Sequence, residues 1–209
     1  HPDPSVERKT GFLAPTYGSS GPLGLKFETP FYVAFAPHRD ATLTPLVTGK
    51  EGVALSGEYR ERTRDGRFEL RGSITETDKR DENNAEIPGR EIRGHLDATG
   101  RFDLDNTWRT GFDIERSTDR SYLRKFDFFG RSDNSLISNA FIEGFRGRNY
   151  ASANAYLYQD LRSGQRPNTP AVAPMLDFNH VGLPTRFGGR FSLDANFLSI
   201  YREDAADTQ

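Results

Sequence analysis

The chain has 209 residues, no cysteine, and 28 Lys and Arg against 30 Asp and Glu, which gives a net charge of −2. No apolar run approaches the ~18 residues of a membrane-spanning helix, so a helical membrane protein is excluded. The charge balance shows no basic footprint for nucleic acid, and the lack of Cys excludes disulfides and thiolate sites. With 16 Phe and 8 Tyr in a polar chain, the composition favours strands with one apolar and one polar face.

The first two apolar runs, near residues 9–15 and 24–35, each contain a proline. Proline cannot donate to a strand ladder, so it belongs at strand ends, edges or bulges. Pro15 alone could mark the end of a strand. Pro30 stands in the middle of an aromatic run, and it predicts that the first hairpin is a weakened edge.

The runs that follow alternate apolar and polar residues with a period of two, which is typical of strands. The longest run predicts a strand over residues 187–201, whose apolar parity includes Phe191, Leu193 and Phe197 and should face lipid or another apolar layer. No sustained helical periodicity competes with these runs. The fold class predicted is all-β, an antiparallel up-and-down meander of about 10–11 long strands. The further runs lie near 40–48, 53–60, 68–75, 92–99, 108–115, 136–146, 151–157 and 172–180.

The connections alternate between short and long. Long polar connections at 77–89, 117–135 and 160–170 should lie at one end of the sheet, and short ones at 64–66 and 147–149 at the other. Short turns at one end and long loops at the other are typical of outer-membrane β-barrels. A soluble β-sandwich also alternates, and that alternative stays open.

The sequence contains no constellation that indicates catalysis. The four histidines show no paired metal spacing, and no nucleophile, phosphate-loop or dinucleotide motif is present. His95 lies on the polar parity of a strand and is interpreted as a surface residue. We therefore expect no enzyme activity, no catalytic residue, no cofactor and no metal site.

Three segments in order, Thr10–Pro15, Glu28–Tyr32 and Ala36–Pro45, resemble the opening of the barrel domain of the LptD family of lipopolysaccharide-assembly proteins, also called organic solvent tolerance proteins. Gly52–Arg60 and Asp119–Phe126 fit the same family in the same order. The resemblance implies that residues 1–8 are a linker from a missing periplasmic domain. It implies that residues 9–209 are the first strands of a large outer-membrane β-barrel.

The resemblance also implies a function, an outer-membrane translocon that inserts lipopolysaccharide into the outer leaflet. Prolines in the family's first two strands weaken a seam that serves as a lateral gate, and they match Pro15 and Pro30. The implied location is the cell outer membrane. The implied partners are lipopolysaccharide, an LptE-like plug lipoprotein and a periplasmic bridge protein, with no nucleic acid. The alternatives are a self-contained small outer-membrane barrel, acting as a porin or adhesin, and a soluble β-sandwich binding module.

Overall fold

The structure is a computed structural model, and it describes residues 8–80, 86–130, 134–162 and 169–202. The expected linker 1–8 lies outside this part of the chain except for Arg8, as do residues 81–85, 131–133 and 163–168 of the expected long connections. The strands are β1 (Gly11–Phe12), β2 (Thr16–Ser20), β3 (Gly24–Glu28), β4 (Phe31–Ala36), β5 (Arg39–Thr48), β6 (Gly52–Arg62), β7 (Gly66–Arg80), β8 (Glu86–Asp103), β9 (Trp108–Ser117), β10 (Ser135–Arg146), β11 (Asn149–Asp160), β12 (Ala171–Val181) and β13 (Ser192–Tyr201). Two short helical segments, α1 (Tyr122–Phe126) and η1 (Phe128–Gly130), stand between β9 and β10.

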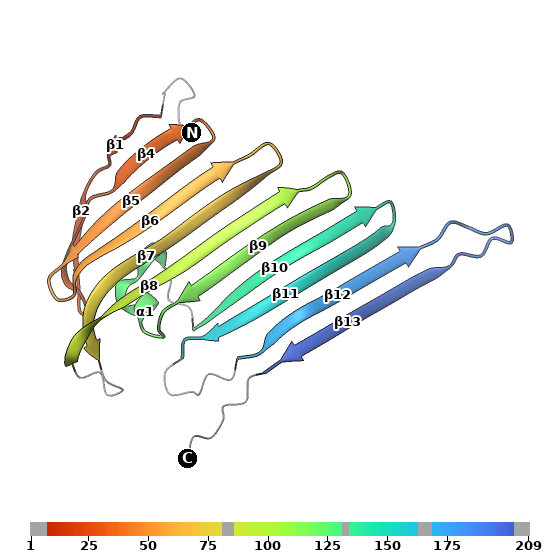
Figure 1. The fold of residues 1–209 in the computed structure, drawn as a ribbon. Helices are drawn as coiled ribbons and strands as arrows, with labels where there is room; N and C mark the ends of the chain where they lie inside the picture. Colours follow the sequence, from red (N-terminus) through yellow and green to blue (C-terminus); the bar gives the residue numbers. More distant parts are fainter. Residues whose placement is uncertain (1–7, 81–85, 131–133, 163–168, 203–209) are drawn as a thin grey trace, which may run out of the picture. The chain divides into compact units, whose positions relative to one another are not determined.

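The thirteen strands form one sheet in the order β1-β4-β5-β6-β7-β8-β9-β10-β11-β12-β13, and β3 pairs with both β2 and β5 (Figure 1). From β4 onward each strand neighbours the next one in the chain. Counting β1 with β2 as one interrupted strand, and β3 with β4 as another, gives eleven strand positions. The predicted antiparallel meander is therefore confirmed.

The two faces of the sheet differ in the way the alternation predicts. In β5 and β6 the paired residues Leu46 and Ala54 are buried, whereas the next pair, Val47 and Val53, is exposed. The exposed outer face is thus apolar, and Val53 leaves 62% of its surface accessible. The opposite, inner face carries buried polar side chains, including Thr48, Ser56, Ser73, Thr75, Thr77, Arg93 and His95.

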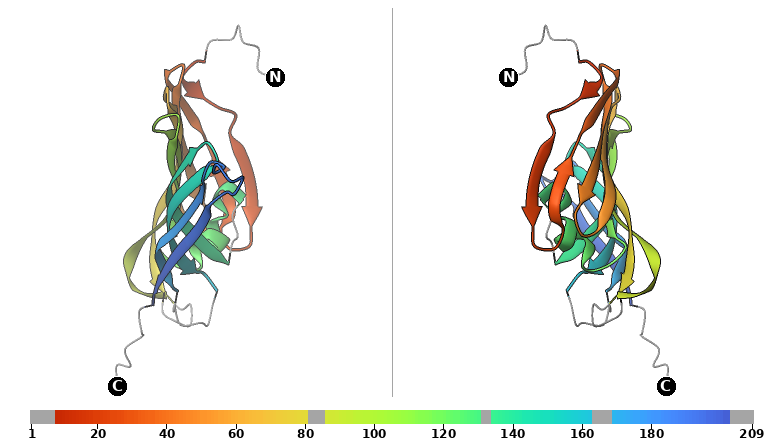
Figure 2. Two further views of the ribbon diagram at one scale, coloured as in Figure 1. Left: turned by 90° about the vertical axis from the view of Figure 1, so that its right-hand side faces the viewer. Right: turned by 90° about the vertical axis from the view of Figure 1, so that its left-hand side faces the viewer.

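The connection after β9 differs from the expected polar loop at 117–135. Figure 2 shows α1 and η1 on the inner side of the sheet. The side chains of Tyr122, Leu123, Phe126 and Phe128 are buried. A helix of five residues is too short to leave a periodic apolar stripe in the sequence. The aromatic residues of this segment are its packing surface.

Strand boundaries also depart from the expected ones at both ends of the chain and in its middle, where β7 and β8 extend into the expected connection 77–89. The predicted strand 187–201 begins at Ser192, because residues 187–191 belong to the preceding connection. The predicted strands 9–15 and 24–35 are each interrupted at their proline. The chain divides into two compact units, and both sites described below lie within the unit formed by residues 1–63, 68–98 and 116–133.

Candidate functional site

The first strand is interrupted between β1 and β2, and its register against the second strand changes there. Residues 13–15 of the first strand stand opposite only two residues, 29 and 30, of the second. One extra residue in one strand of an antiparallel pair is a β-bulge, which bends the strand and disrupts its ladder locally. The register pairs that flank it are Phe12 with Phe31 and Thr16 with Glu28.

This bulge decides which side chains of the first strand face outward. Phe12 and Tyr17 are five residues apart, so a regular strand would point them to opposite faces. The extra residue returns both to the outer face, in the same cross-strand rows as Leu43 and Val47 of β5. Phe12 also packs edge-to-face on Phe31, with ring centroids 4.9 Å apart.

The second strand is interrupted between β3 and β4 without any change of register. Residues 29 and 30 stand opposite two residues of β5, Thr44 and Pro45. The Thr29 N–H donates to the carbonyl of Pro45 at 3.3 Å. On the other side, the Leu13 N–H donates to the carbonyl of Pro30 at 2.9 Å.

Both residues predicted for a gate, Pro15 and Pro30, lie in these two interruptions, and the structure places the interruptions side by side. The nitrogen of Pro30 faces Leu13 but cannot return its hydrogen bond, which removes about 0.5–1.5 kcal/mol of net stabilisation. Within the described residues, no strand pairs with the outer edge of β1 or β2. The weakest part of the sheet therefore adjoins an open edge.

The start of the first strand is fastened to β5 and β6 by ion pairs. Asp40 is only 5% exposed and accepts hydrogen bonds from Arg8 and Arg60, each at 2.9 Å. The Ala34 N–H also donates to the Thr10 hydroxyl at 3.0 Å. These contacts hold the chain at one end of the interrupted pair.

The hairpin between β2 and β3 is fastened at the opposite end. The Lys50 ammonium donates to the carbonyl of Gly21 at 2.8 Å, and the Lys50 N–H donates to that of Leu23 at 3.1 Å. The Gly49 N–H donates to the carbonyl of Leu25 at 2.9 Å. The two interrupted strands are thus secured at both ends and weakest in the middle.

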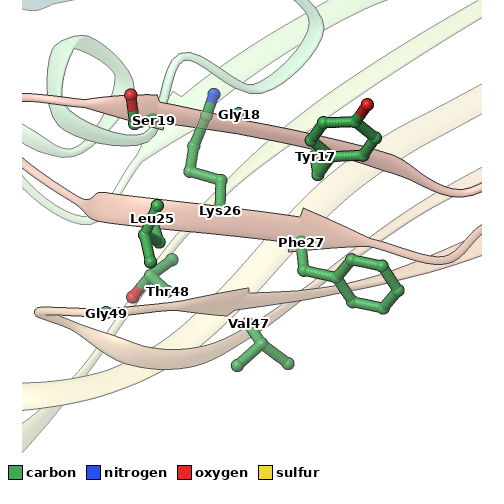
Figure 3. Close-up of a pocket in the computed structure, with 9 residues that line it drawn as sticks. All are labelled: Tyr17, Gly18, Ser19, Leu25, Lys26, Phe27, Val47, Thr48 and Gly49. Atoms are coloured by element: carbon green, nitrogen blue, oxygen red, sulfur yellow. The ribbon is translucent and has the colours of Figure 1, made fainter.

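A shallow, mostly apolar pocket of about 580 Å³ lies over β2, β3 and β5, next to the interruptions (Figure 3). Tyr17, Phe27 and Val47 form one row across the three strands, and all three are exposed. An apolar surface of this kind is stable only against an apolar environment or partner. The other lining residues are Gly18, Ser19, Leu25, Lys26, Thr48 and Gly49.

A second site is the segment that carries α1, whose start is set by Asp119. Its carboxylate accepts hydrogen bonds from the backbone N–H groups of Ser121 and Tyr122, at 2.8 and 3.0 Å, as aspartate does in turns. The helix ends at Asp127, whose left-handed backbone lets its N–H donate to the carbonyl of Leu123 at 2.8 Å. The sequence therefore folds this segment back within a few residues.

Two ion pairs fasten the segment to the sheet. The Arg93 guanidinium, on β8, donates two hydrogen bonds of 2.7 Å each to the Asp119 carboxylate. Lys125 pairs with Glu51 in the turn between β5 and β6 at 2.7 Å, and both side chains are largely buried. We call residues 117–130, with these two pairs, the inner latch.

A buried hydrogen-bonded chain lies beneath the inner latch. The Ser73 hydroxyl contacts His95 Nδ1 at 2.6 Å and the Tyr122 hydroxyl at 2.7 Å. His95 is 6% exposed, so its interpretation as a surface residue was wrong. The polar strand position faces inward, and the folded-back segment covers it.

The environment of the inner latch moves two pKa values. Burial by itself would raise the pKa of Asp119, but the hydrogen bonds and charge of Arg93 outweigh it and hold that pKa below its ordinary value. Burial raises the pKa of Tyr122 to about 12, against a smaller opposing effect of its bond to Ser73. The carboxylate is therefore ionised and the phenol neutral across the physiological pH range.

Among the described residues, no group of three or more His, Asp and Glu side chains could hold a metal ion. No helix within that part of the chain is long and apolar enough to cross a membrane. At both sites the charged groups form ion pairs that hold strands and segments to one another.

Comparison with known proteins supplies the family. Residues 91–209 match the LptD family model, described as LPS transport system D. The chain belongs to the LptD family. A relative from Paracidovorax citrulli (strain AAC00-1), named LPS-assembly protein LptD, is 38% identical over 63% of this chain and 18% of its own length.

Other LptD relatives extend the match over more of the chain. The protein of the same name from Polaromonas sp. (strain JS666) is 30% identical over 79% of this chain, and that from Bordetella avium (strain 197N) is 31% identical over 80%. In each case the match spans only 20% of the relative. The chain therefore corresponds to a small part of the LptD proteins that it matches.

Proposed function

We propose that this chain is the opening part of an outer-membrane LptD translocon, and that its first strands form a lateral gate for lipopolysaccharide. The observation that carries the proposal is the alignment of the interruptions at Pro15 and Pro30 beside the open edge of the sheet. A lipid with a bulky saccharide can leave a barrel sideways only where a seam opens at low cost. Missing ladder bonds supply such a seam without a catalytic residue.

The outer face supports a membrane setting for the sheet. Its exposed apolar residues form rows that would be unfavourable in water but stable in lipid. A soluble β-sandwich would bury that face against a second sheet, and the described residues form a single sheet. We infer the outer membrane as the location, and transport of lipopolysaccharide as the role.

The remaining parts of the proposal concern what surrounds the chain. Residues 1–8 would lead from a periplasmic domain, and residues 9–209 would be the first strands of the barrel. An LptE-like lipoprotein would plug the complete barrel, and a periplasmic bridge protein would deliver lipopolysaccharide to it. Family membership supports these partners, and the matched relatives carry the name LPS-assembly protein.

The test is a double substitution, Pro15→Val with Pro30→Val, in the full-length parent protein. Each valine restores a backbone donor, at position 30 toward Leu13 of the first strand, so the strands beside the seam should stiffen. Surface lipopolysaccharide should then fall, while folded barrel in the outer membrane stays at its normal amount. Pro184→Ala, in the connection before β13, is the matched control and should leave export unchanged. Normal export by the double variant at normal abundance would refute the gate.

A further inference from the structure

A third proline stands level with the two interruptions. Pro45 lies inside β5 and faces Thr29 of the second strand. Pro30 is directly beside Thr29, and Pro15 belongs to the bulge opposite the same residue. The three prolines therefore lie within one residue of the same height on three consecutive strands, and we call this set the proline row.

The effect of Pro45 follows from how antiparallel strands exchange hydrogen bonds. In a hydrogen-bonded pair, each residue donates its N–H to the carbonyl of the other. Thr29 donates to Pro45 at 3.3 Å, but the nitrogen of Pro45 carries no hydrogen and cannot return the bond. The pair of Leu13 and Pro30 loses its returning bond for the same reason, one strand further out.

The backbone donor that Pro15 lacks differs from those missing at Pro30 and Pro45. Backbone groups along a strand point alternately to its two neighbours, and Thr29 directs its N–H toward β5. The bulge residues opposite Thr29 therefore stand where the ladder between the first two strands requires no bond. Pro15 therefore removes no hydrogen bond of that ladder. Pro30 and Pro45 thus each remove a donor from a different pair of neighbouring strands at nearly the same height, and Pro15 lies in the bulge beside them.

The weakening stops at β5. Because Pro45 directs its nitrogen toward Thr29, its pairing with Leu55 of β6 needs no bond from that nitrogen. The neighbouring pair, Thr44 with Ser56, gains a further contact, since the Ser56 hydroxyl donates to the carbonyl of Thr44 at 3.3 Å. Proline inside a strand that has neighbours on both sides is uncommon, which makes its place here notable.

We propose that Pro45 is a positioning residue of the gate, and that the first two strands bend against β5 at the proline row. The fastenings at Asp40 and Lys50 secure the ends of these strands, so bending is confined to the middle. The moving part is then the pair of strands formed by residues 11–36, rather than the first strand alone. This inference rests on the proposed function, because it describes how that gate moves.

The test uses Pro45→Val in the full-length parent, with Pro45→Thr as a second variant that also restores the donor. The matched control is Leu55→Val, which alters the facing residue on the outer face but leaves the ladder to Thr29 untouched. Amide hydrogen exchange of residues 27–33 and surface lipopolysaccharide are measured for each variant. Both Pro45 variants should slow exchange there by about fivefold, the effect of one net hydrogen bond, and reduce export.

The outcomes separate this inference from the gate itself. Suppose that the Pro15 and Pro30 double variant lowers export while both Pro45 variants leave exchange and export unchanged. The role of Pro45 as a positioning residue is then wrong, and the gate stands. If slower exchange after Pro45 substitution leaves export normal, bending at β5 plays no part in transport, and the inference is overturned. If the double variant itself exports normally, the proposed gate is wrong, whatever the exchange at residues 27–33 shows.

Discussion

At the scale of single residues, Asp119 organises the inner latch. Its carboxylate starts the turn into α1 and accepts both hydrogen bonds from the buried Arg93 guanidinium. Removing one partner of such a pair leaves the other charge buried without compensation, which costs more than the pair contributes. The latch should therefore depend on this one carboxylate.

Asp119→Asn tests that dependence through pH. The variant should lose about 1–2 kcal/mol of the free energy of unfolding at neutral pH, a value reduced because Asp119 is one-third exposed. The pKa of Asp119 is lower in the folded protein than its ordinary value of 3.8. Its stabilisation is thus present above that value and is lost as the pH falls through the folded-state pKa.

Urea unfolding of the purified full-length parent, at pH values from 3 to 7, measures this effect. The difference between the wild type and Asp119→Asn should persist at neutral pH and close in acid, below 3.8. The control is Glu76→Gln, which removes an exposed carboxylate of β7 that pairs with Arg90 outside the inner latch. A difference that stays constant down to pH 3 would show that the charge of Asp119 does not hold the latch.

Sequence reasoning identified Pro15 and Pro30 but missed Pro45 and misread His95. The first two stand out because proline in an apolar run conflicts with strand pairing in any context. The role of Pro45 depends on its register with Thr29, which no local pattern specifies. His95 is covered by a segment that follows it by more than twenty residues, so its burial was equally hidden.

At the scale of elements, the bulge at residues 13–15 keeps the first strand in phase with the outer face. Deleting Ala14 would remove the extra residue, and a slip of one residue turns every following side chain to the other face. Tyr17, which is 90% exposed on the outer face, should then point inward. In the wild-type protein, with Ala14 present, the Tyr17 side chain should face lipid.

A spin label at position 17 of the full-length parent distinguishes these states. With Ala14 present, dissolved oxygen, which concentrates in lipid, should relax the label more strongly than a water-soluble nickel complex does. Deleting Ala14 should reverse that preference, while a label at Val47 keeps it. An unchanged preference at position 17 would mean that the bulge does not set the facing of β2.

The sequence could not predict the short elements or the full length of the two longest strands, since β7 and β8 extend beyond the predicted runs 68–75 and 92–99. The helix α1 has five residues, fewer than the two turns that an apolar stripe needs to become visible. The start of β13 was placed five residues early, because alternation continues through residues that form a connection. Long strands such as β5 and β10 were found near their observed bounds, since their alternation reflects two different faces.

At the scale of the whole molecule, the all-β class and the meander could be predicted from alternation alone, and the number of strand positions followed from it. The two interruptions divide the first two positions into four strands, which the sequence indicated only through their prolines. The inward fold of residues 117–130 depends on ion pairs between distant segments and had no local signal. Family membership adds the setting in which this open sheet is proposed to work.

The central claim is that the seam beside the first strand must open for lipopolysaccharide to reach the surface. A photocleavable cross-link between Ser19 and the strand that adjoins the outer edge of β2 in the full-length parent tests it most directly. The same cross-link between Thr44 and Ser56, paired residues of β5 and β6, serves as the control. We expect the seam cross-link alone to stop the display of new lipopolysaccharide and light to restore it, whereas normal display through a locked seam would contradict the gate.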